Sequence, residues 1–110
     1  MAASGLIDQY RLDGASNNVI WKARVSCLLD EHFLKIYVDN VVTEPADLDP
    51  LKKYKGEMVK TKRMILDGVK DHIVYHIASR DTAKEMWDAL SIHALRAKYE
   101  IYADAEVATH

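Results

Sequence analysis

Apolar residues recur along most of this chain at steps of three and four residues, the spacing that places side chains on one face of an α-helix. The first such stripe follows Asn17 and Asn18, either of which can cap a helix, and it consists of Trp21, Val25, Leu28, Leu29, His32 and Ile36. No strand-like alternation extends beyond a few residues, and there is no internal repeat. The periodicity therefore predicts an all-α fold, a small bundle of about four to five helices.

The length of the chain sets its domain organisation. At 110 residues, with 49% hydrophobic and 29% charged residues, the composition is that of one ordinary globular domain. We expect a mostly flexible segment at residues 1–17 with a short ordered stretch at Tyr10 to Leu12, a helical domain at 18–102 and a frayed tail at 103–110. Residues 37–50 interrupt the helical pattern as a linker, and Asp49-Pro50 is a suitable cap and first position for the next helix.

The next helix is the most sharply two-sided segment, and Gly68 is expected to end it. Its predicted core stripe is Tyr54, Met58, Thr61, Ile65 and Val69. Basic side chains occupy the opposite half: Lys52, Lys53, Lys55, Lys60, Lys62 and Arg63. Such a face can neutralise phosphates, but it can also be simply the solvated side of a helix, and no aromatic residue is interleaved with it for base stacking. These six residues are the candidate nucleic-acid contact.

A short helix is predicted at about 70–78, and the stretch DTAKEMWDAL at 81–90 then opens another helix. Thr82 and Glu85 have the spacing of a capping box, in which each side chain satisfies a backbone amide of the first turn. The apolar stripe behind them predicts a helix that continues to about Tyr102. We interpret Trp21 and Trp87 as structural anchors that pack helix on helix, with Thr82 and Glu85 fixing where the second of these helices begins.

Charge and residue types narrow the functional classes. A net charge of −2 favours no polyanionic partner over the whole surface, and the single cysteine, Cys27, fits a reducing compartment. His72 and His76 share a helix face, but zinc normally needs three or four protein ligands. No nucleophile, phosphate loop or membrane-spanning run is recognisable. We therefore expect no enzyme activity, cofactor, metal, membrane contact or small-molecule substrate.

Several short motifs follow one another along the chain in a recognisable order. The first half contains Leu12-Asp13-Gly14, Trp21-Lys22, Leu28-Leu29 and Val38-Asp39. The second half contains Tyr54, Thr61, Ile65, Val69-Lys70-Asp71 and the run from Thr82 to Leu90. This order resembles the N-terminal part of the Gag polypeptide of copia-type LTR retrotransposons, in which the last run reads Thr-Ala-Lys-Glu-Ala-Trp-Asp-x-Leu.

The resemblance implies a helical, retroviral capsid-like domain that self-associates into cytoplasmic virus-like particles around element RNA, without catalysis. The family's Cys-Cys-His-Cys zinc knuckle is missing, and Ser91-Ile92-His93-Ala94 departs from the family pattern. We therefore expect self-association as the main interaction, weak RNA contact at most, and a truncated, decayed or host-adopted copy of the element. The alternatives are a nucleic-acid-binding helical domain that uses the basic face, and a host-adopted adaptor between proteins.

Overall fold

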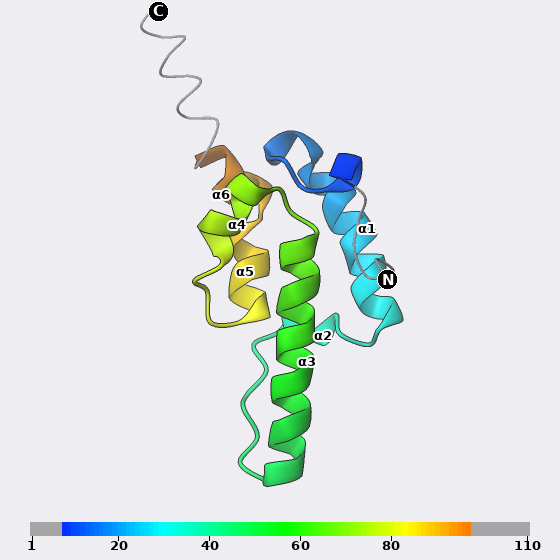
Figure 1. The fold of residues 1–110 in the computed structure, drawn as a ribbon, viewed down its shortest axis with the longest axis vertical. Helices are drawn as coiled ribbons and strands as arrows, with labels where there is room; N and C mark the ends of the chain where they lie inside the picture. The colour runs from blue at the N-terminus through cyan, green and yellow to red at the C-terminus, as the bar shows by residue number, and fades with distance from the viewer. Residues whose placement is uncertain (1–7, 98–110) are drawn as a thin grey trace, which may run out of the picture.

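The computed structural model describes residues 8–97, and within that range it contains six α-helices and no strand (Figure 1). Two 3-10 turns, η2 (Asp8–Tyr10) and η3 (Ala15–Asn17), precede the helices. The helices are α1 (Asn18–Glu31), α2 (Ile36–Asp39), α3 (Leu48–Asp67), α4 (Asp71–Ile77), α5 (Ala83–Ala89) and α6 (Ile92–Leu95). The prediction of a small all-α bundle is confirmed. The predicted frayed tail at 103–110 lies outside the described residues.

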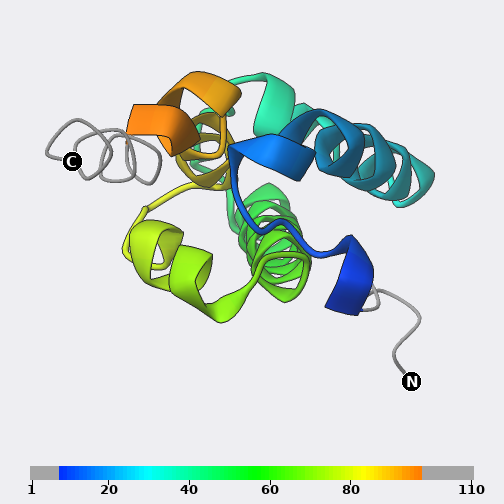
Figure 2. The same ribbon diagram turned by 90° about the horizontal axis from the view of Figure 1, so that it is seen from above.

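Helix α5 lies at the centre of the packing and contacts α2, α3, α4 and α6. The view from above shows α1 on the opposite side of α3 from α4 (Figure 2). Residues from every helix contribute to one buried cluster, which includes Val25, Leu34, Ile65, Ile73 and Met86. Because each helix is short apart from α1 and α3, most of the helical stability must come from this shared core and little from isolated helix formation.

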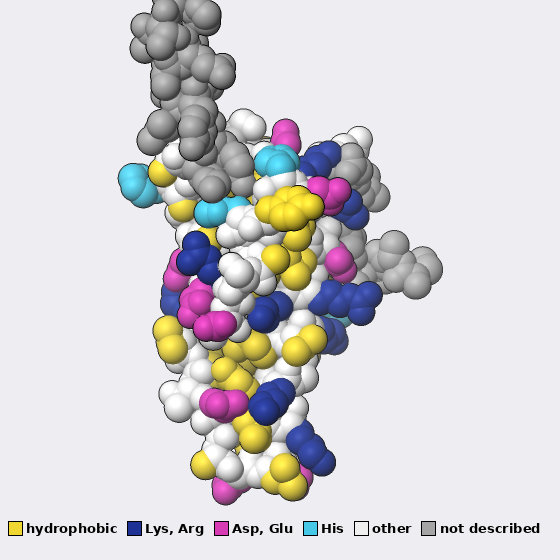
Figure 3. Space-filling view, turned by 60° about the vertical axis from the view of Figure 1, so that its left-hand side comes forward, with side chains coloured by type: hydrophobic (Ala, Val, Ile, Leu, Met, Phe, Trp, Pro, Cys, Tyr) yellow, Lys and Arg dark blue, Asp and Glu magenta, His cyan; other side chains and the backbone are white. Residues whose placement is uncertain are grey.

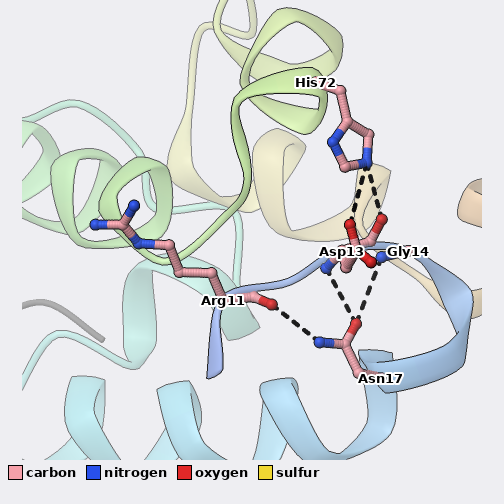
Figure 4. Close-up of polar contacts among 5 residues, drawn as sticks. All are labelled: Arg11, Asp13, Gly14, Asn17 and His72. Carbon is pink, nitrogen blue, oxygen red and sulfur yellow. Dashed lines mark hydrogen bonds and ion pairs between the residues drawn. The ribbon is translucent and has the colours of Figure 1, made fainter. Parts of the chain in front are cut away.

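The N-terminal segment packs more extensively than the predicted ordered stretch at Tyr10 to Leu12. Leu12 is fully buried and forms a parallel bridge with Val69. Its amide donates to Gly68 O at 2.9 Å, and its carbonyl accepts from Lys70 N at 2.9 Å. Asn17, expected as a helix cap, makes no capping bond to α1. Its side chain instead holds the preceding turn, accepting from Asp13 N at 3.1 Å and donating to Arg11 O at 2.9 Å (Figure 4).

Helix α1 buries one stripe but ends earlier than its apolar pattern predicts. Asn18, Trp21, Val25 and Leu29 face the core, whereas His32 and Ile36 are exposed. The helix ends at Glu31 because Phe33 adopts a left-handed conformation with φ 59°. Leu34 N then bonds to Leu29 O at 2.8 Å and Phe33 N to Asp30 O at 3.0 Å, the hydrogen-bond pattern of a Schellman motif.

Segment 37–50, expected to be a linker, begins within the single turn of α2. Tyr37 and Val38 of this turn are buried, so the apolar pattern there belongs to the core. The next helix, α3, begins at Leu48 with Asp47 in the cap position, two residues before the predicted Asp49-Pro50 start. Pro50 is tolerated because amides in the first turn of a helix have no partner within that helix.

Gly68 ends α3 as predicted, and its lack of a side chain also allows a close contact. Trp21 Nε1 donates to Gly68 O at 2.6 Å. A Cβ atom at position 68 would lie 3.3 Å from that indole nitrogen. A side chain at this position would therefore crowd the indole, which would have to shift by a few tenths of an ångström beside the carbonyl that accepts its hydrogen bond.

The predicted helix from 82 to 102 is interrupted after Ala89. Its start is confirmed, since Thr82 Oγ1 accepts from Glu85 N at 3.1 Å. Glu85 Oε2 accepts in return from Asp81 N at 3.2 Å, one residue earlier than in a standard capping box. Ser91 then caps α6 by accepting from Ala94 N at 3.1 Å. Among residues 83–95 the continuous stripe is thus divided between two helices with separate starts, and the predicted helix end near Tyr102 lies outside the described residues.

Candidate functional site

The six predicted basic residues all lie on α3, and the structure leaves most of them at the surface. Lys52, Lys53, Lys55, Lys60 and Arg63 are exposed, and Lys62 is half-buried. Lys62 Nζ donates to Asp81 O at 3.2 Å, across the gap to the start of α5. Arg63 Nε lies 3.7 Å from Asp67 Oδ2 on the following turn. Two of the six cations are therefore partly occupied by contacts within the chain.

Apolar side chains interrupt this basic face, a feature that was not predicted from the sequence. Leu48 and Val59 are exposed on the same side of α3, and Leu66 is only partly buried. A groove of about 290 Å³ lies there, lined by Val59, Lys62, Arg63, Leu66 and Asp67. Helical spacing at positions 59, 62, 63 and 66 was the available signal, because these positions share one face. We call these five lining residues the α3 groove.

The space-filling view shows the same mixture of side-chain types over a wider area. Hydrophobic side chains lie at the surface between Lys, Arg and carboxylate side chains in the lower part of the molecule, where Figure 1 places the first half of α3 and the preceding segment (Figure 3). A surface meant only for phosphates gains little from exposed aliphatic groups. The mixed character is more typical of a protein-binding surface.

The two predicted tryptophan anchors lie together but differ in burial. Trp21 is 1% exposed, whereas Trp87 is only partly buried and packs against the core cluster. Their ring centroids are 5.5 Å apart with a 35° interplanar angle. Lys22 Nζ lies 4.8 Å from the Trp87 ring centroid. Trp87 therefore contacts both the ring of Trp21 and the ammonium of Lys22.

Burial of Lys22 beside this ring affects its acid–base behaviour. Desolvation lowers the pKa of the Lys22 ammonium, the carboxylate of Asp88 opposes the shift, and Lys84 adds to it. Lys84 in turn pairs with Asp88 at 2.8 Å. The sequence motif Lys84-Glu85-Met86-Trp87-Asp88 thus builds a small charged rim around the partly exposed indole. This arrangement stabilises the Trp87 contact.

His72, one of the two histidines considered for a metal site, takes another role. His72 Nε2 lies 2.8 Å from Asp13 O and 3.8 Å from Asp13 Oδ1, so it fastens α4 to the N-terminal turn (Figure 4). Among residues 8–97, no three His, Cys, Asp or Glu side chains gather in a way that could hold a metal ion.

A second hollow of about 240 Å³ lies beside η2 and is lined by Gln9, Tyr10, Asn17, Ile20, Trp21 and Arg24. There Arg24 stacks over the Tyr10 ring at 4.2 Å.

Comparison with known proteins adds no relative. No protein-family model, curated protein or solved structure matches this chain. Within the described part of the chain, none of the helices has the length and apolar character needed to span a bilayer. The function must therefore be argued from the sequence motifs and from the surfaces described above.

Proposed function

We propose that this chain is a non-catalytic structural module that acts by self-association, in the manner of the capsid-like domain of a copia-type Gag. The observation that most supports the proposal is the α3 groove, where exposed apolar residues lie among cations on the longest helix. Exposed apolar patches rimmed by polar residues are typical of protein–protein contact sites. The ordered motifs at 12–14, 21–22, 38–39 and 82–90 supply the link to Gag.

The burial pattern fits a role as a building block. Motif residues such as Leu12, Val38 and Leu90 are buried, and Thr82 caps α5. These residues stabilise the fold itself. The contacts between copies then depend on the exposed residues around them, which is how one helical framework can support assembly without a reaction centre.

The direct test is the mass of the protein as a function of concentration. Light scattering after size exclusion, from low to high micromolar concentration, should show a mass that rises above that of one chain. Electron microscopy of the same samples should show particles, rings or filaments. A strict monomer throughout the series, with no assemblies in the images, would count against the proposal.

A second candidate function is nucleic-acid binding through the exposed part of the basic face. Lys52, Lys53, Lys55 and Lys60 are exposed and form no ion pair with any other residue in the range 8–97. Four free ammonium groups on one helix could neutralise several phosphates. Binding of a labelled single-stranded RNA should then weaken steeply with salt, with a log–log slope of about −0.7 per phosphate contacted.

Charge reversal separates this candidate from self-association. The triple variant Lys52→Glu, Lys53→Glu, Lys60→Glu should lose RNA binding, whereas Arg80→Glu, at an exposed position off α3, should retain it. RNA affinity that is indifferent to both the triple reversal and added salt would exclude this use of the face. Host-adopted adaptor activity would appear instead as capture of a different protein without self-association.

A further inference from the structure

The end of α1 displays an aromatic side chain that the fold itself does not require. Phe33 is 87% exposed and has φ 59°, in the position of a Schellman motif where glycine is preferred. A residue with a Cβ atom is strained in this left-handed conformation. An exposed ring gains no compensating burial. Glycine would suit the turn better, so local stability does not explain phenylalanine at this position.

The charges around Phe33 are also unfavourable for the helix. Asp30 and Glu31 are exposed in the last turn of α1, which contains no basic residue. Carboxylates at a helix C-terminus lie next to the negative end of the helix dipole and destabilise it. Residues that break local rules without a structural gain are often functional. We call Asp30, Glu31 and Phe33 the α1 tip.

The α3 groove has the complementary character. Its apolar wall comes from Val59 and Leu66, and Lys62 and Arg63 supply positive charge at its edge. Asp67 is its one carboxylate and already pairs with Arg63. A dry apolar cavity of about 150 Å³ can hold a benzene ring, so a groove of about 290 Å³ has room for the ring of Phe33.

The tip and the groove do not cover each other within one copy. Phe33 is 87% exposed and Val59 is 64% exposed. Figure 1 shows the end of α1 to one side of α3, away from α4 and α5. Contact between the two surfaces therefore requires a second molecule.

We propose that the α1 tip of one copy docks into the α3 groove of a second copy. Phe33 inserts between Val59 and Leu66, while Asp30 and Glu31 approach Lys62 and Arg63. Aromatic residues in desolvated pockets commonly dominate binding energy, and charged rims set specificity. The acidic, aromatic α1 tip complements the basic, apolar α3 groove, and this charge complementarity points to another copy of this chain as the occupant.

This contact joins different surfaces on the two partners, so each copy retains one free tip or one free groove. Head-to-tail contacts of this kind close into rings or extend into filaments. The inference rests on the proposed function, because it names the surfaces through which self-association occurs.

The test uses two single variants of the full chain. Phe33→Gly removes the ring and suits the backbone, and Val59→Glu places a carboxylate in the groove at an exposed helical position. Each variant alone should associate at least about tenfold more weakly than the wild type, as expected for loss of a binding hot spot. Tyr75→Ala removes another exposed aromatic side chain, on α4, and should leave association unchanged.

Mixing the two variants gives the sharper result. The Val59→Glu chain keeps an intact tip and the Phe33→Gly chain keeps an intact groove, so the mixture should form one-to-one complexes that grow no further. Sedimentation velocity would measure this directly. Wild-type association that both variants retain in full, or variants that fail to pair in the mixture, would overturn the tip-and-groove contact and leave self-association standing. A wild-type chain that is monomeric at every concentration would overturn both.

Discussion

At its N-terminal end α1 places Asn18 and Trp21 in the core, with their side-chain N–H groups bonded to Leu90 O and Gly68 O. At its C-terminal end the same helix exposes Phe33 in a left-handed conformation beside two carboxylates. One end buries an indole and an amide side chain, whereas the other exposes a phenyl ring and two carboxylates. The difference separates residues that hold the fold from residues that are available to a partner.

The largest loss of stability should come from a substitution at the buried N-terminal end of α1. Trp21→Ala removes a fully buried ring and its hydrogen bond, so the free energy of unfolding in urea should fall by about 3 to 5 kcal/mol. Trp87→Ala should lower the free energy of unfolding by clearly less, because the Trp87 side chain is only partly buried. Equal losses at the two positions would contradict the unequal burial of the pair.

High pH should lower the free energy of unfolding through Tyr37 of α2, the short helix that follows the α1 tip. Tyr37 Oη donates to Glu57 Oε1 at 2.7 Å, and burial together with this bond raises the pKa of the Tyr37 phenol to about 12. The unfolded chain loses the same proton near pH 10, so the folded state binds more protons above that pH. The stabilisation is complete below about pH 10 and is lost as the pH rises through about 12.

The measurement is the difference in unfolding free energy between the wild type and Tyr37→Phe. This difference should change by roughly 2 kcal/mol in favour of the variant as the pH rises from about 9 to about 12. Tyr75→Phe, at a position 88% exposed, should show no such change and serves as the control. A parallel pH response in all three proteins would rule out the Tyr37–Glu57 contact as its source.

A smaller loss is expected from the buried amide of Asn18. Asn18→Ala leaves Leu90 O without its side-chain donor, which should lower the free energy of unfolding by about 1 to 2 kcal/mol. Asn40→Ala, at an exposed position after α2, is the matched control and should have little effect. Urea denaturation of the two variants provides the comparison, and a neutral Asn18→Ala would show that the contact contributes nothing net.

The smallest effect is a gain of stability, and it comes from a substitution at the exposed C-terminal end of α1. Phe33→Gly should raise the free energy of unfolding by about 0.5 to 1 kcal/mol, because relief of the left-handed strain exceeds the entropy cost of glycine. Phe33→Ala keeps the Cβ atom and should give no gain. Destabilisation by Phe33→Gly would show that the ring supports the fold after all.

Some helix boundaries could be predicted because they have local signals in the sequence. The Thr82 cap, the end of α3 at Gly68 and the short helix near 70–78 all agree with the structure. Helix ends were harder. The stripe through His32 and Ile36 continues past the true end of α1, because Phe33 replaces the glycine that normally marks such a turn.

Only the basic residues of the candidate site could be predicted from the sequence. The six basic residues follow directly from the helical spacing of α3, and the structure leaves five of them exposed. The α3 groove depends on Val59 and Leu66 remaining uncovered. Burial of that kind is decided by which helices pack against α3, and a single sequence does not specify their positions. The contact between Lys22 and the Trp87 ring was unpredictable for the same reason.

The bridge between Leu12 and Val69 links the N-terminal segment to the turn between α3 and α4. Gly68 O accepts from both Leu12 N at 2.9 Å and Trp21 Nε1 at 2.6 Å, so both of its lone pairs are used. Detaching residues 8–17 would expose the Leu12 amide while leaving the indole bond in place. Amide hydrogen exchange at Leu12 and Lys70 therefore reports opening of this segment separately from global unfolding, which releases the Trp21 indole proton as well.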